Sequence, residues 1–359
     1  MTNPNRVTKL AVCLAIFATS IVAVPTSATA AKAQAKPTAS KSSAAKAPAR
    51  STPKKKAYSP STARARRTQL ARARAAAAAR QMRDVQTPRF RVDEFGREVP
   101  DVRAEAAIIY NPTTGEVLWE DHAQDQRSMA SITKVMTALV FLDSGAPMST
   151  PVTVQRSDVS HASTTYLRTG YTLTADDLLN LLLVGSDNAA ARALARISPY
   201  GSEGFITKMN EKAAELGLAN TRYADPSGLM SENVSSAYDL ARLISHAAAD
   251  ERVGGIMRKQ TYTTQSGKQT ITARSTNQIV RSGDIDVVGG KTGFISRSGY
   301  CLATLLRLPQ SGQEVAFVVL GAKSNASRFW ETRHLFNWMS SRAKTLIEGD
   351  AQHQQQEEN

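Results

Sequence analysis

Hydrophobic and polar positions along the chain divide it into three parts. Residues 10–24 form a short apolar run, whereas residues 31–89 contain almost no large apolar residue. From about residue 101 to residue 348, apolar positions recur at spacings of two or of three to four, which are the periods of strands and helices. We therefore expect one folded domain at 101–348, preceded by a leader and a polar linker and followed by a polar tail at 349–359.

Within the domain, strand patterns stand at both ends and helical patterns in the middle. The strands that we expect are 106–110 and 116–120 (a hairpin around Asn111–Gly115), 152–154, 260–264, 286–289, 299–308 and 315–321. The expected helices begin at Ser131 and cover 175–184, 189–195, 202–216, 236–249 and 326–347. This order predicts an α/β (α+β) fold, with an antiparallel sheet flanked by helices, an all-helical lobe beside it, and a site in the cleft between them.

The N-terminus has the features of an export signal. Arg6 and Lys9 precede the apolar run, and small residues follow it up to Ala30, the order found in secretory signals. About fifteen apolar residues are too few to span a bilayer, which takes roughly twenty. We expect a signal peptide at 1–30 and a protein exported to the periplasm or cell-wall compartment, soluble or peripherally associated. Cys13 would leave with the signal, and Cys301, in an apolar run, is expected to be a buried core thiol without a disulfide partner.

The positive charge of the chain is concentrated before the folded domain. Residues 31–89 contain sixteen Lys and Arg against one acidic residue, Asp84. The whole chain carries +14, and residues 1–30 hold two further basic residues, so residues 90–359 are left with −3. A segment of this composition cannot bury enough apolar surface to fold. We expect a disordered Ala/Lys/Arg/Pro linker over 31–100, with a transient helix at 64–83.

The basic linker could serve as an arm for an anionic partner. Nucleic acid is not expected, because the basic cluster at 64–83 contains no aromatic residue and the protein is predicted to be exported. An anionic membrane surface or a cell-wall polymer would attract the arm through its charge. A solvated spacer without a partner is the remaining interpretation.

Ser131 and Lys134 are candidates for a nucleophile and its base. Residues three apart lie on one face of a helix, and a lysine can accept a proton if burial lowers its pKa. Spacing alone does not single out this pair, because the same spacing recurs at Ser43/Lys46, Ser51/Lys54 and Ser341/Lys344.

Two downstream motifs distinguish Ser131 from the other serines. Ser186-Asp187-Asn188 falls between two predicted helices, where side chains can project from a turn. Lys291-Thr292-Gly293 occurs once and follows two glycines, which indicates close approach of a ligand to a strand backbone. A lysine and a threonine there offer a positive charge and a hydroxyl to a carboxylate.

The three motifs S-x-x-K, S-x-N and K-T-G, in this order, resemble those of the active-site serine penicillin-recognising enzymes. Over about residues 104–345 the chain is similar to the low-molecular-mass penicillin-binding proteins of the D-alanyl-D-alanine carboxypeptidase and endopeptidase family. Further stretches carry this resemblance: 127–134, 209–218, 225–229 and 236–241. It implies a DD-peptidase/β-lactamase-like fold, peptidoglycan stem peptides and β-lactams as ligands, and neither metal nor cofactor.

The resemblance also implies roles for individual residues. Ser131 would attack the carbonyl of a D-Ala-D-Ala-type bond to give an acyl-enzyme, while Lys134 takes its proton. Ser186 would relay a proton to the leaving amine. The N–H groups of Ser131 and Phe294 would form the oxyanion hole.

The remaining motif residues would bind substrate. Asn188 would hold Lys134 and the substrate backbone. Lys291 and Thr292 would bind the terminal carboxylate, and Gly293 belongs to the same substrate-binding strand.

Three other interpretations fit less well. A Ser-His-Asp hydrolase would need a G-x-S-x-G elbow, which the chain does not contain. A class A-like β-lactamase would need E-x-x-L-N, but Ala219 follows Glu215–Leu218 where asparagine is required. A non-catalytic wall-binding protein would not need three intact catalytic motifs.

Within the family, two features favour the endopeptidases, which cut cross-links, over the carboxypeptidases, which trim pentapeptide stems. The sequence stops after one helix and a polar tail, whereas carboxypeptidases of this group often add a β-rich domain and an anchor. Ile295 stands where the common carboxypeptidase sequence has threonine. We expect an endopeptidase, with a carboxypeptidase as the alternative.

Overall fold

The computed structural model describes residues 60–357 of the chain and the side chains of residues 64–343. The predicted signal peptide at 1–30 and the first part of the linker lie outside the described residues. In chain order the elements are α1 (Pro60–Gln86), β1 (Phe90–Val92), β2 (Glu98–Pro100), β3 (Ala106–Asn111), β4 (Glu116–Asp121), β5 (Arg127–Ser128), the 3₁₀ turn η1 (Ala130–Ile132), α2 (Thr133–Asp143), β6 (Pro151–Thr153), α3 (Arg156–Val159), β7 (Thr172–Thr174), α4 (Ala175–Val184), α5 (Asn188–Ile197), α6 (Gly201–Glu215), β8 (Val234–Ser235), α7 (Ala237–Ala249), α8 (Glu251–Met257), β9 (Thr261–Ser266), β10 (Gln269–Arg274), α9 (Gln278–Ser282), β11 (Val287–Ile295), β12 (Gly299–Arg307), β13 (Glu314–Ala322) and α10 (Asn325–Glu357).

The main sheet has five strands in the order β11-β12-β13-β3-β4, and every neighbouring pair is antiparallel. The predicted hairpin is confirmed as β3 and β4, and the two predicted strands around the turn at 309–312 are confirmed as β12 and β13. The order places β11 and β4 at the edges. The predicted antiparallel sheet is therefore confirmed.

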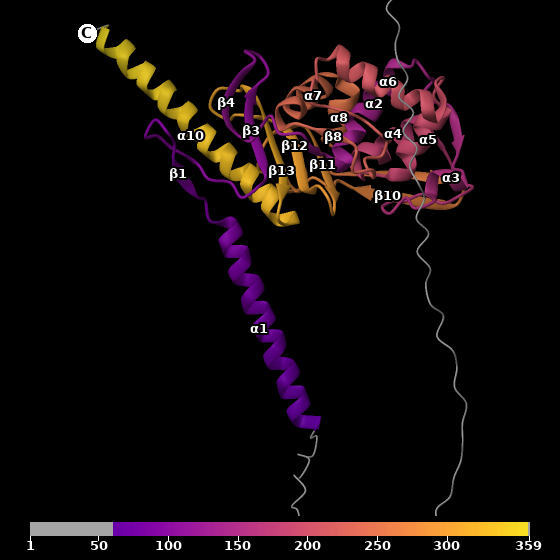
Figure 1. Cartoon of the computed structure of the whole chain (residues 1–359), viewed down its shortest axis with the longest axis horizontal. Helices are drawn as coiled ribbons and strands as arrows, with labels where there is room; N and C mark the ends of the chain where they lie inside the picture. Colours follow the sequence, from indigo (N-terminus) through magenta and orange to yellow (C-terminus); the bar gives the residue numbers. More distant parts are fainter. Residues whose placement is uncertain (1–59, 358–359) are drawn as a thin grey trace, which may run out of the picture. The chain divides into compact units, whose positions relative to one another are not determined.

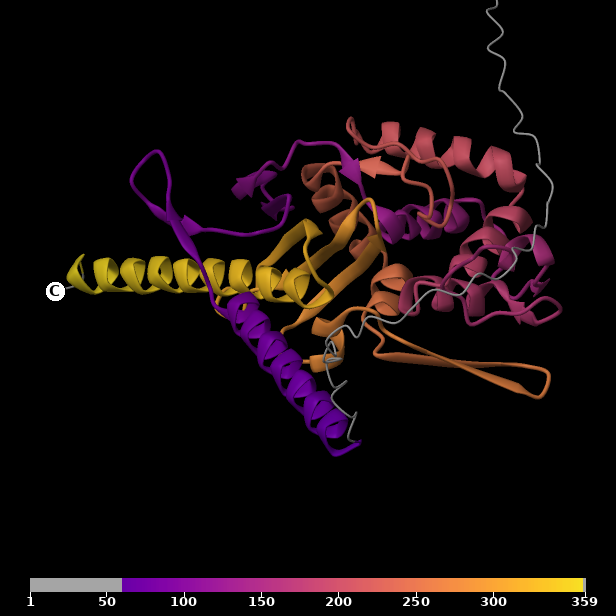
Figure 2. The same ribbon diagram turned by 60° about the horizontal axis from the view of Figure 1, so that its bottom comes forward.

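Alternate residues of the central strands pack on opposite faces of the sheet. On one face, residues such as Ile108 and Val318 join a core with the helical lobe. On the other face, Ile109 and Phe317 pack against the C-terminal helix α10, which contributes Phe336. Figure 2 shows α10 (yellow) along one side of the sheet and the helices of the helical lobe beyond the sheet. The apolar side of the C-terminal helix thus packs on the sheet.

The helical lobe is the block predicted between residues 149 and 250 (Figure 1). Its helix α4 begins with a reciprocal cap: Thr174 Oγ1 accepts from the N–H of Asp177 at 3.0 Å, and the Asp177 carboxylate accepts from the N–H of Thr174 at 2.9 Å. The leucines that follow are buried. This cap fixes where α4 begins, and its end brings the Ser186 motif to the junction with α5.

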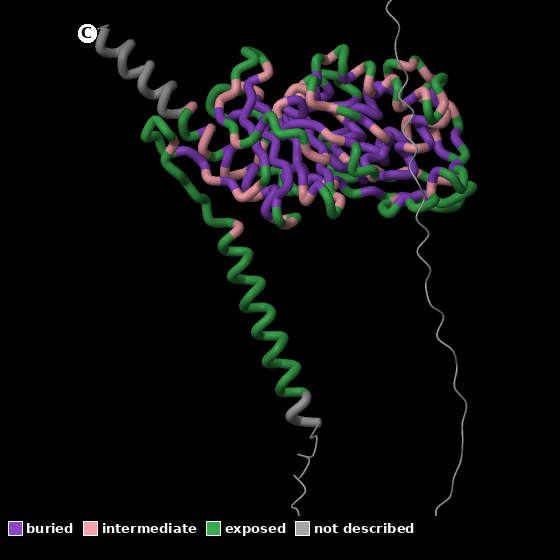
Figure 3. Tube along the Cα trace, viewed as in Figure 1, coloured by how far each residue is buried: buried purple, intermediate pink, exposed green. Residues whose placement is uncertain are grey.

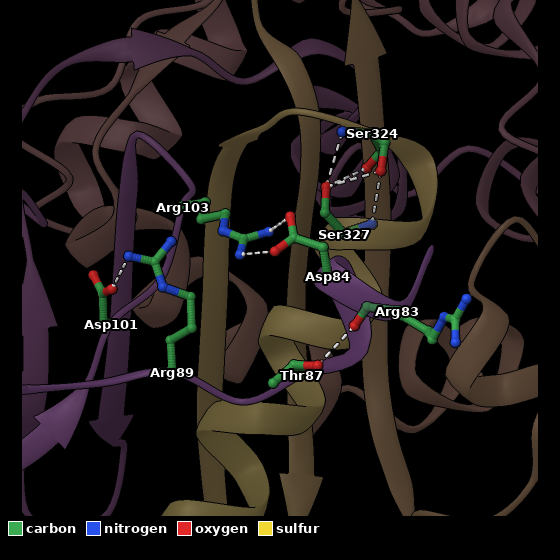
Figure 4. A network of polar contacts seen from close by, with 8 residues as sticks. All are labelled: Arg83, Asp84, Thr87, Arg89, Asp101, Arg103, Ser324 and Ser327. Atoms are coloured by element: carbon green, nitrogen blue, oxygen red, sulfur yellow. Dashed lines mark hydrogen bonds and ion pairs between the residues drawn. The ribbon is translucent and has the colours of Figure 1, made fainter. Parts of the chain in front are cut away.

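Between residues 60 and 100 the structure contains more regular structure than the predicted disordered linker with its transient helix at 64–83. Helix α1 covers 60–86, and β1 and β2 form a small hairpin. Alanine and arginine are strong helix formers, so a helix forms without an apolar face, and Figure 3 shows it exposed along its described length. At its C-terminal end Asp84 accepts two hydrogen bonds from Arg103, at 2.6 and 2.8 Å (Figure 4).

Smaller differences from the prediction concern one additional strand and the end of one helix. Strand β10 was not predicted; it pairs with β9 in a hairpin outside the main sheet. Helix α10 continues to Glu357, past the predicted end at residue 347. Cys301 is buried, as predicted. Among residues 60–357, no helix combines the length and apolar character needed to cross a bilayer.

Candidate active site

Ser131 lies in the 3₁₀ turn η1, directly before α2. The predicted helix therefore begins two residues later than expected, but Lys134 still follows within one turn, with its Nζ 3.0 Å from Ser131 Oγ. The preceding residue, Ala130, has a positive φ of 48°, a strained conformation for a residue with a side chain. Gly228 packs directly against this turn, which only glycine permits, because a Cβ at this position would overlap the carbonyl oxygen of Ala130.

Lys134 is fully buried and has three hydrogen-bond partners. Its Nζ contacts Ser131 Oγ, the side-chain oxygen of Asn188 at 2.6 Å and the backbone oxygen of Ser227. Burial lowers the pKa of Lys134 to about 7, although the carboxylates of Asp225 and Asp187 act in the opposite direction. A substantial fraction of this side chain is therefore neutral at neutral pH.

These contacts match the hydrogen-bonding capacity of a neutral lysine. A neutral amine has two N–H donors and one lone pair. The side-chain oxygen of Asn188 and the backbone oxygen of Ser227 can only accept hydrogen bonds, so each accepts one of the two N–H groups of Lys134. The lone pair is left for the hydroxyl proton of Ser131. The arrangement can thus deprotonate Ser131.

The loop from Asp225 to Leu229 positions the Ser227 carbonyl. The buried Asp225 carboxylate accepts backbone N–H groups of the loop, among them those of Ser227 at 3.0 Å and Gly228 at 3.1 Å. Thr137 of α2 donates to the carbonyl of Pro226 at 2.6 Å. Sequence comparison gave this stretch only as part of a family resemblance, without a role; the structure shows that it supplies a partner of Lys134.

The Ser186 motif lies in the turn between α4 and α5. Ser186 has a φ of 58°, and Asp187 caps α5 by accepting the N–H of Ala190 at 2.9 Å. Asn188 is the first residue of α5; its Oδ1 faces Lys134 and its Nδ2 donates to the carbonyl of Ala162 at 2.6 Å. Two opposite hydrogen bonds fix the amide orientation that Lys134 requires.

The Lys-Thr-Gly motif lies on β11, at the edge of the sheet. Lys291 is buried, and its Nζ donates to Ser186 Oγ at 2.7 Å and to the carbonyl of Thr292 at 3.0 Å. Burial lowers the pKa of Lys291 well below its usual value, and the nearby Lys134 adds to this effect. Gly293 allows β11 to approach the nucleophile turn, since a Cβ there would lie 2.5 Å from the carbonyl oxygen of Met129.

A cavity of about 380 Å³ opens at these residues. The predicted site residues Ser131, Ser186, Asn188, Thr292, Gly293 and Phe294 line it, together with Ser163, Thr164, Leu229, Thr276, Ile295, Ser296 and Arg328. Lys134 and Lys291 are buried and contact the lining residues Ser131 and Ser186. The structure thus brings every predicted site residue into one cluster.

Among the lining residues that sequence reasoning did not assign to the site, Thr276 and Arg328 contact the Lys-Thr-Gly strand. Thr276 accepts a hydrogen bond from Thr292 at 2.6 Å. Arg328 of α10 donates to the carbonyls of Gly293 at 2.9 Å and Cys301 at 3.1 Å, and burial lowers its pKa to about 10. Neither carries a local motif, so only tertiary packing reveals them.

Comparisons with known proteins agree with this geometry. The model of peptidase family S11, described as D-alanyl-D-alanine carboxypeptidase, matches residues 93–324. The chain belongs to this family. It is therefore a serine DD-peptidase, a penicillin-binding hydrolase, as the three motifs indicated.

Family members of known name are similar over most of the folded domain. A D-alanyl-D-alanine endopeptidase of Escherichia coli K12 is 32% identical over 246 residues, which cover 67% of this chain and 79% of that protein. A D-alanyl-D-alanine carboxypeptidase of Bacillus subtilis 168 is 29% identical, covering 67% of this chain and 63% of its own. The crystal structure of the Streptomyces K15 DD-transpeptidase has a TM-score of 0.63 at 29% identity and covers 67% of this chain and 97% of that one. The DD-peptidase fold is thus confirmed.

Proposed function

We propose that this serine DD-peptidase acts as a D-alanyl-D-alanine endopeptidase, cutting peptidoglycan cross-links through an acyl-enzyme on Ser131. The observation that carries the assignment of the nucleophile is the contact of Ser131 Oγ with the Nζ of the buried Lys134 at 3.0 Å. The same spacing on α10, Ser341 and Lys344, has no such setting, because Ser341 is exposed.

In the acylation step, neutral Lys134 accepts the Ser131 proton as Oγ bonds to the D-alanyl carbonyl carbon. The negative charge that develops on the carbonyl oxygen is stabilised by the N–H groups of Ser131 and Phe294. Each such donor contributes about 3–4 kcal/mol in well-studied hydrolases.

In the next step the bond from carbon to the leaving nitrogen breaks. Ser186 gives a proton to that nitrogen, and its oxygen already accepts a hydrogen bond from Lys291 at 2.7 Å, which makes its own proton easier to release. Lys134 then transfers the proton that it took from Ser131 to Ser186, which returns both side chains to their starting protonation states. Water then attacks the acyl-enzyme, with Lys134 again as base, and releases the product.

The leaving portion carries a carboxylate next to the scissile bond. Thr292 and Thr276 offer hydroxyl groups to this carboxylate. Its negative charge would favour the charged form of the buried Lys291, whose Nζ contacts the lining residue Ser186. Asn188 lines the cavity and binds the substrate backbone. In a folded region with a net charge of −3 over residues 90–359, binding of an anion depends on such local groups.

The endopeptidase assignment has support from the relatives. Proteins named D-alanyl-D-alanine endopeptidase in E. coli and Haemophilus influenzae are both 32% identical, over 79% and 88% of their lengths. Two carboxypeptidases of E. coli match over 62% and 65% of their lengths, and one of Streptomyces sp. K15, 29% identical, matches over 88% of its length. The carboxypeptidase activity is the second candidate, because proteins named D-alanyl-D-alanine carboxypeptidase are 29–32% identical to this chain.

Purified muropeptides decide between the two activities. We expect the enzyme to convert cross-linked dimers into monomers, and Ser131→Ala to abolish this conversion. Ser341→Ala, in the same S-x-x-K spacing, is the matched control and retains activity. Loss of the terminal D-Ala from monomer pentapeptides without any dimer cleavage would instead establish a carboxypeptidase.

We also propose that the protein is exported, that residues 1–30 are removed, and that the enzyme works in the periplasm or cell-wall compartment, soluble or peripherally associated. Charge and composition of the N-terminus support this. N-terminal sequencing of the mature protein should start at Ala31. A mature protein that starts at residue 1 or 2 would contradict it.

The basic arm is proposed to bind an anionic wall polymer rather than a membrane surface. Seven arginines of α1 occupy all sides of the helix, and no ion pair joins any of them to another described residue: Arg64, Arg66, Arg67, Arg72, Arg74, Arg80 and Arg83. A bilayer is bound by a helix with one apolar and one basic face, whereas a flexible chain of phosphates can follow charges around a helix. Salt-sensitive co-sedimentation with poly(glycerol phosphate), lost when residues 1–86 are removed, would support this. Binding only to anionic phospholipid vesicles would contradict it.

A further inference from the structure

Another cavity, of about 650 Å³, lies at the edge of the main sheet that is farthest from the Lys-Thr-Gly strand. Its walls come from the edge strand β4, from the β1–β2 hairpin and from the C-terminal helix α10. In the order β11-β12-β13-β3-β4, four spacings separate β4 from β11, about 19 Å at about 4.8 Å each. No lining residue is shared with the active-site cavity. We call this cavity the β4 groove, and no step of the proposed reaction uses it.

Aromatic side chains reach the β4 groove from all three of its walls. Trp119 comes from β4, Trp338 from α10, and Phe95 from the turn of the hairpin. Trp119 is buried in the core beneath the groove and Trp338 is half-buried, whereas Phe95 is 71% exposed. An exposed aromatic ring beside two further aromatic residues is typical of a surface that binds a ligand.

The hairpin turn holds Phe95 in a fixed position. The Asp93 carboxylate accepts the backbone N–H groups of Phe95 at 2.9 Å and of Arg97 at 2.8 Å, and it also binds the Arg97 side chain at 2.8 Å. The Arg97 guanidinium lies 4.9 Å from the centre of the Phe95 ring, and Arg342 lies equally close to the ring of Trp338. Both rings are thus positioned before a ligand arrives, so binding orders fewer side chains.

The charged side chains of the β4 groove balance one another. Three arginines and three acidic residues line it: Arg91, Arg97, Arg342, Asp93, Glu94 and Glu120. Two of the arginines are already paired with aspartates, at 2.8 and 3.0 Å. A polyanion gains little from such a lining, whereas a neutral ligand finds N–H donors and carboxylate acceptors side by side. Hydroxyl groups both donate and accept hydrogen bonds, so a ligand rich in hydroxyls fits these groups.

A peptide strand added to the edge of the sheet fits the β4 groove less well. The pairing of β4 with β3 changes register between Ile109 and Tyr110, and such a bulge interrupts the row of backbone groups that a further strand would need. The two exposed positions of β4 carry carboxylates, Glu116 and Glu120. Charged side chains at a sheet edge oppose strand addition. A ligand is therefore recognised here by side chains.

We propose that the β4 groove binds a chain of N-acetylated sugars, the carbohydrate part of peptidoglycan. The C–H groups on the face of a sugar ring are attracted to the negative face of an aromatic ring, so sugar rings stack on Phe95 and Trp338. Their hydroxyl and acetamido groups pair with Glu94, Glu120 and Arg342, which form no ion pair with another described residue. Only the source of the sugar rests on the proposed function. The enzyme thus holds the sugar strand at one edge of the sheet and the peptide at the other.

A soluble oligomer of N-acetylglucosamine without any peptide tests the β4 groove. Its dissociation constant is measured by titration calorimetry with the full chain carrying Ser131→Ala. Phe95→Ala is the first test variant, and Val92→Ala is its matched control, because both side chains are 71% exposed on the same hairpin but only Phe95 lines the groove. Neither substitution removes a core residue, so both proteins should fold.

A second pair of variants tests α10. Trp338→Ala removes the half-buried ring from the groove. Trp330→Ala is its matched control, because Trp330 is half-buried on the same helix and also lies beside an arginine, Arg333, but does not line the groove. Circular dichroism establishes that each variant is folded.

We expect the sugar oligomer to bind with a dissociation constant of about 1 mM or tighter. Phe95→Ala and Trp338→Ala should each weaken binding about tenfold, because each removes one stacked ring, and the two controls should leave it unchanged. Absence of binding, or equal binding by all variants, would overturn the proposal. So would a dimer that dissociates in Phe95→Ala, observed by sedimentation without bound sugar, because the groove would then be occupied by a second copy of the chain.

The result is independent of the peptidase reaction, because the protein lacks the Ser131 hydroxyl and the probe has no peptide. Sugar binding by a protein whose unsubstituted form cleaves no muropeptide dimer would refute the proposed function alone. Dimer cleavage without sugar binding would refute the role of the β4 groove alone.

Discussion

Asn188→Asp is expected to shift the pH dependence of acylation. Only neutral Lys134 can accept the Ser131 proton, so the acylation rate of the enzyme by penicillin should rise about tenfold per pH unit below pH 7 and level off above it. The substitution keeps the shape of the side chain but places a carboxylate oxygen where Asn188 Oδ1 now lies, 2.6 Å from Nζ. An opposite charge stabilises the charged lysine, so the pKa of Lys134 must rise.

The size of the shift follows from this distance. Two unit charges 4 Å apart interact by about 4 kcal/mol at an effective dielectric constant of about 20, and these groups are closer. Burial of the new carboxylate offsets part of that energy, because burial disfavours its charged form as well. We expect the pKa of Lys134 to rise by about 1–3 units, the range found for close opposite charges.

Stopped-flow measurement of penicillin acylation from pH 5 to pH 10 provides the assay. Asn180→Asp is the matched control, because Asn180 on α4 also accepts a hydrogen bond from a lysine, Lys259, at 2.7 Å. A new charge at this position should leave the rising limb of the acylation rate at pH 7. A rising limb that stays near pH 7 in Asn188→Asp would refute the assignment of Lys134 as the base. So would a wild-type rate that is constant from pH 5 upward.

Three further predictions concern the surroundings of the nucleophile. Gly228→Ala should lower the free energy of unfolding by about 3 kcal/mol or more, because the backbone φ of 79° is strained for alanine and the new Cβ would overlap Ala130. The control Gly267→Ala, where φ is 56° and the space around the residue is open, should lower the free energy of unfolding by about 1 kcal/mol in the same denaturant titration. Equal losses in the two variants would contradict this reasoning. Arg328→Lys should slow penicillin acylation about tenfold, since lysine cannot hold the carbonyls of Gly293 and Cys301 together; an unchanged rate would show that Arg328 does not position β11. Removal of residues 1–86 should leave the acylation rate within twofold, because none of the described residues of that segment lines the active-site cavity. A larger loss would assign α1 a part in catalysis.

The parts of the fold that were predicted from sequence are those with a clear periodic pattern. The leucine run of α4 and the β-prone runs of β3 and β4 indicated their secondary structure by residue type and flanking turn residues, although α4 and β3 are buried on nearly all sides. Helix α1 was expected only as a transient helix at 64–83, because the segment has too few apolar residues to fold; its alanines and arginines favour a helix by propensity alone. Strand β10 has only two buried residues, Ile271 and Ala273, in alternation with exposed ones, a pattern too short to predict a strand.

The site shows the same division. Ser131, Ser186 and Lys291 belong to short motifs, and their order along the chain indicated that they meet. Contacts such as Arg328 with Gly293 or the Ser227 carbonyl with Lys134 join segments 35 and 93 residues apart. Nothing local in the sequence marks a backbone carbonyl as a partner, so these contacts required the structure.

The central claim is that Ser131 is the residue acylated by substrate and by β-lactams. Intact-mass analysis after incubation with penicillin tests it directly. The wild-type protein should gain the mass of one penicillin molecule, and Ser131→Ala, shown to be folded by its circular dichroism, should gain none. An adduct that persists in Ser131→Ala would contradict the account.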